Sequence, residues 1–397
     1  MPAGRPPAPP RAGPRLAVIS PFPPNFSGVG QYGWHLAGGL ARTGCFRSIT
    51  VLADAAPTNG AGAVHAAPPG VTVRRVWRRD DPHAAFVLWK ALEAERPDVV
   101  WMNAGLTIFG RSHAANFAGL TLPALLRRGG LPVVVTLHEL AETVHLPALG
   151  LRNGPVVQWG ARQAVRLLLQ ADAVVVTLRR YAERLERGYG VRHVHHFPHG
   201  AFAEVEAPAP PAPSPEILCF TSLAPHRGLA ILLEAFRLVR ARLPAATLTI
   251  AGEDHPRFPG YGARLRASLD GQAGLRWLGA QPEAEVRALF DAARVVVLPY
   301  LATTGASSVL SRAAAHGRPT VASDLPELRA TSQEAGLRVV WTPAGDAQAL
   351  AQALSDLLAD PERQAELARH NLDAMRPLAL SATSRRYADL LAQVAGG

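Results

Sequence analysis

Residues 295–327 constrain the fold of this chain most, because they contain a complete strand, loop, helix and second strand. The segment opens with the apolar run VVVL, whose β-branched side chains are typical of a parallel strand buried on both faces. A hydroxyl-rich loop follows, and an apolar helix then ends at Gly317 and Pro319. Such a loop leaves backbone N–H groups free to bind an anion at the start of the helix. An ordinary turn between a strand and a helix has the same pattern, so the neighbouring segments decide between the two interpretations.

Short apolar runs alternate with helical spacing along both halves of the chain. In the first half, we expect strands at residues 16–19, 48–52, 71–76, 98–102, 131–137, 172–177 and 191–197, with a helix at 83–95. In the second half, we expect strands at 216–220, 247–251, 275–278 and 295–298, and helices at 283–293, 309–316, 343–358, 361–375 and 381–394. This alternation predicts the α/β class, with parallel sheets covered by helices.

A Pro- and Ala-rich segment at 203–215 interrupts the alternation and predicts a boundary between two domains. A chain of 397 residues is also too long for one compact core. We therefore expect five parts: a disordered Pro-rich tail at 1–14, a Rossmann-like domain at 15–202, the linker at 203–215, a second Rossmann-like domain at 216–376, and a helix within 377–397 that packs back on the first domain.

Two features bear on the cellular location. No run of about 18 apolar residues could form a membrane-spanning helix, and no signal-type apolar segment follows the Pro-rich tail. We therefore expect a cytoplasmic protein. Cys45 and Cys219 fall in different expected domains, which argues against a disulfide bond between them.

The charge of the chain is distributed unevenly. The net charge is +10, with +11 on residues 1–200 and −1 on residues 201–397. A nucleic-acid partner would explain a basic chain, but the sequence has no zinc-ligand spacing, no aromatic RNA-binding signature and no condensed basic helix. Diffuse, one-sided charge fits an anionic membrane surface or a polyanionic substrate better. We expect the first half to bind one of these two.

Two places in the first half carry candidate site residues. Gly28 and Gly30 lie in SGVG, which we expect to form a loop before a helix, where a phosphate or sugar can approach the backbone closely. The spacing differs from the dinucleotide fingerprint, because a long loop separates it from the first strand. His138 follows the strand at 131–137, at the carboxyl end where open α/β sheets bind their ligands. A single histidine at this place is also compatible with a structural role.

Two further segments carry basic side chains that could bind a ligand. Alternation along the strand at 191–197 puts His193 and His195 on one face and His196 on the other, so we expect no metal site there. Arg227 lies on a loop at the start of a helix, where its guanidinium is placed to pair with a phosphate. As one of many arginines, it is equally compatible with an ordinary surface position.

Five motifs occur in a fixed order: SGVG, TLHE, PHG, LAPHRG, and VLPY followed by AHGRPTVASDLPE. In this order they resemble the retaining GT-B glycosyltransferases of family 4, over nearly the whole chain after the tail. The resemblance implies two Rossmann-like domains that face each other across a cleft and close on a nucleotide-sugar, without a metal ion or another cofactor. It also implies roles for the candidates: Gly28 and Gly30 near the donor phosphates or the acceptor, His138 as the catalytic residue beside the reacting sugar, Arg227 in place of a phosphate-binding lysine, and Ser307, Ser308 and Val309 at the diphosphate. Catalysis would then stabilise the charge that develops on the departing diphosphate.

The chain departs from the family pattern at two motifs. Alignment on Gly317 and Pro319 puts Thr304 and Arg312 at the two ends of the E-x7-E motif, where family members usually carry glutamates. The Gly-Arg pair common before the phosphate-binding lysine is Thr221 and Ser222 here. We expect four further contacts to donor or acceptor, at Ser222, Thr304, Arg312 and Glu327. For Arg312 we expect either that it binds a negative charge of the donor, which we favour, or that it turns outward.

Three functions fit these features. The first is transfer of a sugar from a nucleotide-sugar to a carbohydrate or lipid-linked acceptor, with retention, in cell-envelope, polysaccharide or glycolipid synthesis at the inner face of the membrane. The second is a catalytically silent GT-B subunit that serves an active transferase, and the third is a GT-B nucleotide-sugar epimerase or hydrolase. Arg227, His138 and the phosphate loops favour the enzyme, whereas Thr304 and Arg312 favour the silent subunit. The sequence leaves the sugar, the base and the acceptor open.

Overall fold

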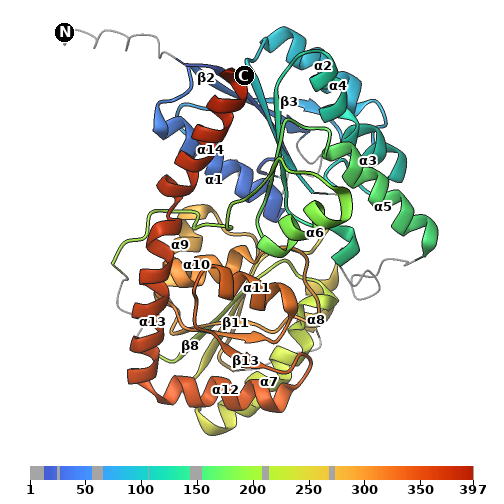
Figure 1. Cartoon of the computed structure of the whole chain (residues 1–397). Helices are drawn as coiled ribbons and strands as arrows, with labels where there is room; N and C mark the ends of the chain where they lie inside the picture. Colours follow the sequence, from blue (N-terminus) through green and yellow to red (C-terminus); the bar gives the residue numbers. More distant parts are fainter. Residues whose placement is uncertain are drawn as a thin grey trace, which may run out of the picture.

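The computed structural model describes residues 13–24, 27–55, 66–105, 107–143, 154–207, 214–267 and 273–396. In these residues, two parallel sheets lie one above the other, each covered by helices (Figure 1). Most of the expected tail at 1–14 and the middle of the expected linker at 203–215 lie outside the described residues.

The first sheet has the strand order β3-β2-β1-β4-β5-β6-β7. Its strands are β1 (Arg15–Ser20), β2 (Ser48–Asp54), β3 (Thr72–Trp77), β4 (Val99–Ala104), β5 (Val133–Leu137), β6 (Ala173–Val176) and β7 (Val194–His196). The second sheet has the order β10-β9-β8-β11-β12-β13. Its strands are β8 (Glu216–Phe220), β9 (Thr247–Ala251), β10 (Leu275–Leu278), β11 (Val295–Leu298), β12 (Thr320–Ser323) and β13 (Val340–Thr342). The strand pairs are parallel, so the prediction of two Rossmann-like sheets is confirmed.

Each strand order reverses beside the first strand of its sheet, between β1 and β4 and between β8 and β11. Open α/β sheets bind ligands at such reversals. The apolar runs are buried as their β-branched composition predicts, and the four residues of β11 are at most 1% exposed.

Helices cover both sheets. In the first domain they are α1 (Gly28–Thr43), α2 (Ala84–Glu95), α3 (His113–Leu120), α4 (Leu122–Arg128), α5 (Pro155–Leu168) and α6 (Arg179–Tyr189). In the second they are α7 (Leu229–Arg242), α8 (Tyr261–Ala267), α9 (Glu283–Ala292), α10 (Ser308–Ala315), α11 (Pro326–Glu334), α12 (Ala347–Ala359) and α13 (Pro361–Met375). Short 3-10 turns occur at η1 (Ala141–Thr143), η3 (Pro225–Arg227) and η4 (Arg376–Leu378). Within the described ranges, no helix combines the length and apolar character that crossing a bilayer requires.

The last helix, α14 (Leu380–Gly396), returns from the second domain to the first and lies beside α1 (Figure 1). Its Tyr387 is fully buried, with the hydroxyl 3.1 Å from the Tyr32 hydroxyl and 3.0 Å from Thr136 Oγ1. The two helices approach each other so closely that a Cβ on Gly39 of α1 would overlap Ser384 of α14. The expected packing of the C-terminal helix is thus confirmed, and it ties the two domains together.

Candidate functional site

The carboxyl ends of β5 and β11 meet where the two domains contact each other. Gly305, on the loop after β11, has φ +66°, and a Cβ at this position would overlap the carbonyl oxygen of His138, which follows β5. Only glycine combines this left-handed backbone with so close an approach. Candidate residues from both halves of the sequence are therefore brought to one place.

An asparagine that the sequence did not single out holds the His138 ring. The Asn103 amide nitrogen, at the end of β4, donates to the carbonyl oxygen of Val29 at 2.7 Å and to Ser20 Oγ at 2.9 Å. A backbone carbonyl can only accept a hydrogen bond, so Asn103 Oδ1 must face His138, whose Nε2 lies 2.6 Å away. The network thus assigns the proton to Nε2 and leaves Nδ1 as a hydrogen-bond acceptor.

Burial and, to a smaller extent, the nearby His199 lower the pKa of His138 to about 3. Tyr32 packs edge-on against the imidazole, with the ring centroids 4.8 Å apart. The imidazole is therefore neutral near pH 7 and keeps part of its surface exposed. It can accept a hydrogen bond from a sugar hydroxyl, but it does not act there as a cation.

The SGVG segment forms the start of a helix, so the expectation of a loop before the helix was wrong. Ser27 is the N-cap of α1, and its hydroxyl accepts the N–H of Gly30 at 2.9 Å. The N–H of Gly30 is thus used inside the protein. Among the described residues, no acceptor binds the N–H groups of Gly28 and Val29, and Gly28 is exposed. Gly28 remains a candidate for ligand contact through its backbone.

Arg227 lies in η3, immediately after the loop that follows β8. Its guanidinium lies over the Tyr300 ring, 4.5 Å from the centroid, and its buried Nε has no hydrogen-bond partner. No carboxylate in the described residues forms an ion pair with it. Gly228 has φ +68° and packs so closely on Pro299 that a Cβ would overlap the proline carbonyl, which seats Arg227 beside the end of β11. A half-buried, unpaired guanidinium at this edge can bind a phosphate.

The N-terminus of α10 lies on the adjacent loop. Ser307 caps the helix, accepting the N–H of Leu310 at 3.3 Å, and donates its own N–H to Thr331 Oγ1 at 3.2 Å. The hydroxyl and the N–H of Ser307 are therefore both used inside the protein, and the residue is buried. The N–H groups of Ser308 and Val309 have no acceptor in the described part of the chain, so they remain available to an anion.

Arg312 follows neither of its two expected outcomes. It is 5% exposed, and its Nη1 and Nη2 lie 2.6 and 3.4 Å from the carboxylate oxygens of Glu283, at the start of α9. His35 of α1, in the first domain, lies 3.4 Å from the same carboxylate. Arg312 therefore points inward, and Glu283 neutralises its charge. Its guanidinium is therefore not free in this geometry, and the hypothesis that it binds a negative charge of the donor is not supported.

Glu327 is also occupied by the protein. Its buried carboxylate forms an ion pair with Arg180 of α6, so it links the two domains. Its expected role as a ligand contact is not supported by this placement.

Ser222 and Thr304 are half-buried, and no other described residue forms a hydrogen bond with their side chains. They remain candidates for contact with a ligand. Within the described residues, no cluster of three or more His, Cys, Asp or Glu side chains is arranged to hold a metal ion.

Comparison with known sequences gives one match for each domain. Residues 26–203 match the family described as Glycosyltransferase Family 4, and residues 214–360 match the family described as Glycosyl transferases group 1. The chain belongs to the family 4 glycosyltransferases.

Two curated relatives of this glycosyltransferase come from Mycolicibacterium smegmatis. A GDP-mannose-dependent alpha-(1-6)-phosphatidylinositol monomannoside mannosyltransferase is 26% identical over 373 residues, which is 89% of this chain and 91% of that protein. A phosphatidyl-myo-inositol mannosyltransferase is 33% identical over 144 residues, which is 36% of this chain and 35% of that relative.

Solved structures share the fold of this glycosyltransferase. Sucrose-phosphate synthase from Thermosynechococcus elongatus superposes with a TM-score of 0.74 at 17% identity, covering 96% of this chain and 98% of that one. HepE from Anabaena, in complex with UDP-glucose, superposes with a TM-score of 0.69 at 16% identity, covering 96% and 100%. These likenesses confirm the GT-B fold.

Two residues of the glycosyltransferase site were not predicted from the sequence. Asn103 had a usable signal, because it ends an apolar run at the carboxyl edge beside the strand that carries His138. Glu283 had none, since it precedes Arg312 by 29 residues and lies on a different helix. Periodicity does not predict such a contact between two elements.

Proposed function

We propose that this glycosyltransferase transfers a sugar from a nucleotide-sugar to an acceptor hydroxyl, with retention of anomeric configuration and without a metal ion. The observation that carries the proposal is the unpaired guanidinium of Arg227, which lies over Tyr300 at the start of the loop that leads to the free N–H groups of α10. A cation and a helix N-terminus together suit the diphosphate of a nucleotide-sugar. HepE, which shares the fold, has been solved with UDP-glucose, and the mannosyltransferase relative is named for GDP-mannose.

The chemistry follows from these groups. As the bond between the sugar and the diphosphate breaks, negative charge grows on the leaving oxygen, where Arg227 and the N–H groups of Ser308 and Val309 would stabilise it. Neutral His138 would accept a hydrogen bond from a hydroxyl of the donor sugar and so fix the position of the ring. Ser222 and Thr304 would contact the nucleotide, since the carboxylate common at the position of Arg312 is absent.

We propose a lipid-linked acceptor at the cytoplasmic face of a membrane, in glycolipid or other cell-envelope synthesis. Both mannosyltransferase relatives are named for phosphatidylinositol-based acceptors. In the described part of the first domain, the large apolar side chains that are exposed lie on α2 to α5, with exposed fractions between 42% and 80%: Phe86, Phe117, Leu125, Val156 and Trp159. These helices pack against one another on one side of that domain (Figure 1).

Basic side chains accompany this apolar surface. Arg128 on α4 and Arg166 on α5 are exposed, and no carboxylate of the described residues pairs with them. Apolar side chains among arginines suit the boundary of an anionic bilayer. Sedimentation with vesicles of neutral lipid, with and without anionic lipid, tests this docking. We expect binding only to anionic vesicles, decreasing as salt rises.

Trp159→Ser should weaken vesicle binding several-fold. Leu301→Ser is the matched control, because Leu301 is exposed to 42% in the second domain. Equal binding to neutral and anionic vesicles, or an equal loss in both variants, would contradict a docking surface on α2 to α5.

A second candidate is a silent GT-B subunit, and the pairing of Arg312 with Glu283 favours it. A ribose-binding carboxylate at position 312 is replaced by a cation that the protein itself neutralises. Thermal unfolding with a panel of nucleoside diphosphates and nucleotide-sugars separates the two functions. A ligand at about 100 times its dissociation constant should add about 2.7 kcal/mol to the free energy of unfolding. If no nucleotide or nucleotide-sugar stabilises the protein at millimolar concentration, we conclude that the protein is a silent subunit.

A further inference from the structure

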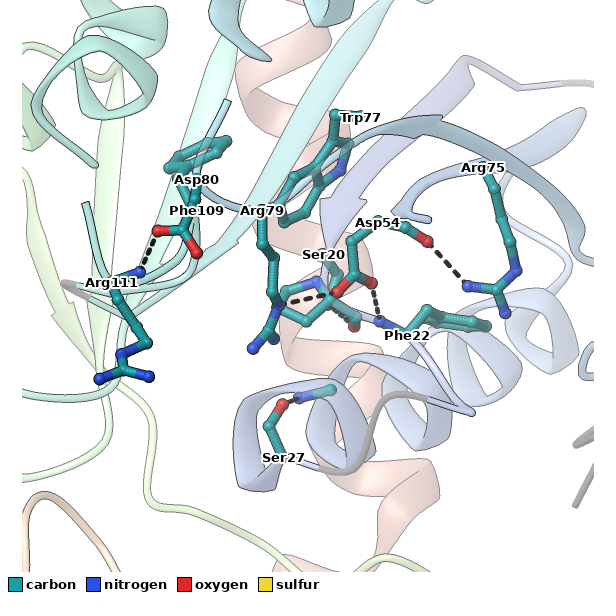
Figure 2. Close-up of polar contacts among 12 residues, drawn as sticks. Ser20, Phe22, Ser27, Asp54, Arg75, Trp77, Arg79, Asp80, Phe109 and Arg111 are labelled. Carbon is teal, nitrogen blue, oxygen red and sulfur yellow. Dashed lines mark hydrogen bonds and ion pairs between the residues drawn. The ribbon is translucent and has the colours of Figure 1, made fainter. Parts of the chain in front are cut away.

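The side-chain amide of Asn103 is the centre of a hydrogen-bond network behind His138. Asn103 is fully buried at the end of β4, whose neighbours in the sheet are β1 and β5. One side chain on the middle strand therefore reaches Ser20 at the end of β1, Val29 at the start of α1, and His138 after β5. Figure 2 shows Ser20 next to the first turn of α1, which Ser27 caps. Asn103 thus joins three elements at the binding edge of the sheet.

The partners of the amide fix its orientation. The Ser20 hydroxyl donates to the carbonyl oxygen of Pro21 at 2.7 Å, so its oxygen can only accept from Asn103. The carbonyl oxygen of Val29 also accepts only. Both N–H groups of the amide are used by these two acceptors, and its oxygen is left for the Nε2–H of His138. Two independent contacts therefore give the same assignment.

Helix α1 packs directly on this network. A Cβ on Gly33 of α1 would overlap both Ser20 Oγ and Asn103 Nδ2. The backbone of His138 is held from the same strand, because its N–H donates to the carbonyl oxygen of Ala104 at 3.2 Å. Two successive residues of β4 therefore hold the backbone and the ring of His138.

The other ring nitrogen of His138 is left for a ligand. No described residue forms a hydrogen bond with Nδ1, and the imidazole is partly exposed. A neutral imidazole without such a partner exchanges between two tautomers and two ring orientations, and Nδ1 is an acceptor in only one of the tautomers. Without Asn103, His138 would offer an acceptor at this place for only part of the time.

We propose that Asn103 is a positioning residue of the transfer reaction, which holds His138 in the tautomer and orientation where Nδ1 accepts a hydroxyl of the donor sugar. This inference rests on the proposed transfer from a nucleotide-sugar. In this role Asn103 touches neither donor nor acceptor and acts through His138 alone. It also explains why an amide suits the position: a carboxylate would hold the same Nε2–H, but its charge would favour protonation of the imidazole.

The other surroundings of His138 keep the imidazole neutral. Burial raises the pKa of Tyr32 on α1 well above its usual value, and burial lowers the pKa of His199 to about 4, so both are uncharged near pH 7. Glu139 adds a carboxylate as the next residue in the chain, and the second domain contributes Gly305, which has no titratable group. These groups are unchanged by a substitution at position 103, so a new pH dependence in such a variant reports on the imidazole.

The tautomer can be measured without an assay of activity. Nuclear magnetic resonance on the full chain, with histidine labelled by the heavy nitrogen isotope, distinguishes the two ring nitrogens, and the spectrum of His138→Gln identifies the signals of His138. Wild type should show the proton on Nε2. Asn103→Leu, which has a similar volume and no polar atom, should show a mixture of tautomers. A proton on Nδ1 in the wild type, or an unchanged tautomer in Asn103→Leu, would refute the proposal.

Kinetics separate positioning from support of the fold. The assay is release of GDP from GDP-mannose or of UDP from UDP-glucose, with phosphatidylinositol vesicles as acceptor. Asn103→Leu should lower kcat about tenfold or more. Asn103→Asp should recover most of this loss near pH 8, because its carboxylate still accepts the Nε2–H of His138.

The variant Asn103→Asp should also acquire a pH dependence that the wild type lacks. Its carboxylate raises the pKa of His138 from about 3 toward the usual value of 6.5, and a protonated imidazole has no acceptor. The kcat of Asn103→Asp relative to wild type should therefore fall about threefold or more as pH falls from about 8 to about 5.

Asn371 provides the matched control. It is 1% exposed on α13, in the second domain, and its amide accepts the N–H of Arg338 at 2.7 Å and donates to the carbonyl oxygen of the same residue at 2.9 Å. Asn371→Asp and Asn371→Leu thus disturb a similar buried amide away from His138. They should lower the melting temperature and leave both the tautomer of His138 and the pH dependence of kcat as in the wild type.

The outcomes separate this inference from the proposed transfer. If wild type releases GDP or UDP, but Asn103→Leu keeps the wild-type kcat or Asn103→Asp follows the wild-type pH dependence, the positioning role is refuted and the transferase remains. If Asn103→Leu does not fold, the tautomer of the wild type and the pH dependence of Asn103→Asp still decide. If the wild type releases neither GDP nor UDP, the proposed transfer fails, and the inference fails with it.

Discussion

Arg227 and Arg312 are two arginines of the second domain, and only Arg312 has a carboxylate partner among the described residues. Arg227 lies over an aromatic ring with a buried, unpartnered Nε, whereas Arg312 lies over Phe202 with both terminal nitrogens on Glu283. The charge of Arg227 remains available to a ligand, whereas the charge of Arg312 is neutralised by Glu283 inside the protein. Position in a family motif therefore does not decide the role of a charged side chain. The partner that the rest of the chain supplies decides it.

The largest expected effect follows from reversing the charge of Arg312. Arg312→Glu places two carboxylates together in a buried site, and it should lower the free energy of unfolding by about 3–5 kcal/mol, as is typical when a buried pair is broken. The double variant Arg312→Glu with Glu283→Arg restores opposite charges and should recover at least half of that loss. Urea denaturation measures both changes. A loss below about 1 kcal/mol, or no recovery in the double variant, would show that the pair is not structural.

Acid should weaken the same pair. Burial opposes ionisation of Glu283, but the hydrogen bond from His35 and the charge of Arg312 outweigh it and lower its pKa from 4.5 to about 2. A lowered pKa stabilises the folded state above the unfolded value of 4.5, and this contribution is lost as pH falls toward 2.

Glu283→Gln is the variant that isolates this effect. The difference in stability between wild type and Glu283→Gln should be largest near pH 7 and should shrink as pH falls from 4.5 toward 3. Urea denaturation at several pH values measures it. A difference that stays constant with pH would remove Glu283 as a charged partner of Arg312.

A smaller effect on stability is expected at His138. This residue lies at the candidate site, as Arg227 does, but its imidazole is uncharged near pH 7. His138→Ala should lower turnover about tenfold or more and leave the melting temperature within a few degrees. Release of nucleoside diphosphate from the nucleotide-sugar measures turnover. His113→Ala, at an exposed histidine, is the control. A large loss of stability with unchanged turnover would make His138 a structural residue.

The sequence predicted those features that short segments determine. The strand β11 and the helix α13 have the predicted bounds, because a buried apolar run and a proline start are local signals. Strand β13 was missed, since it is three residues long and two of these residues are only partly buried. The first turn of α1 was mistaken for a loop because glycines disfavour helices, whereas here Ser27 caps the helix.

The candidate site was predicted less completely than the fold. Arg227, His138 and the start of α10 were predicted as site residues because each follows a strand at the binding edge of a sheet, and this role stays a prediction. The pairs of Arg312 with Glu283 and of Glu327 with Arg180 were not found, because each joins elements that only the tertiary structure brings together. Sequence patterns thus indicated where charges lie, and the structure showed which of them are neutralised.

Calorimetric titration with GDP and UDP shows whether Arg227 holds the donor diphosphate. The three proteins to compare are wild type, Arg227→Gln, and Arg237→Gln at an exposed position of α7. Wild type and Arg237→Gln should bind one nucleoside diphosphate with equal affinity. Arg227→Gln should bind it less tightly by about 1.5–3 kcal/mol, the range for a hydrogen bond to a charged group. Equal affinity in all three proteins, or no binding by the wild type, would contradict a donor site at Arg227.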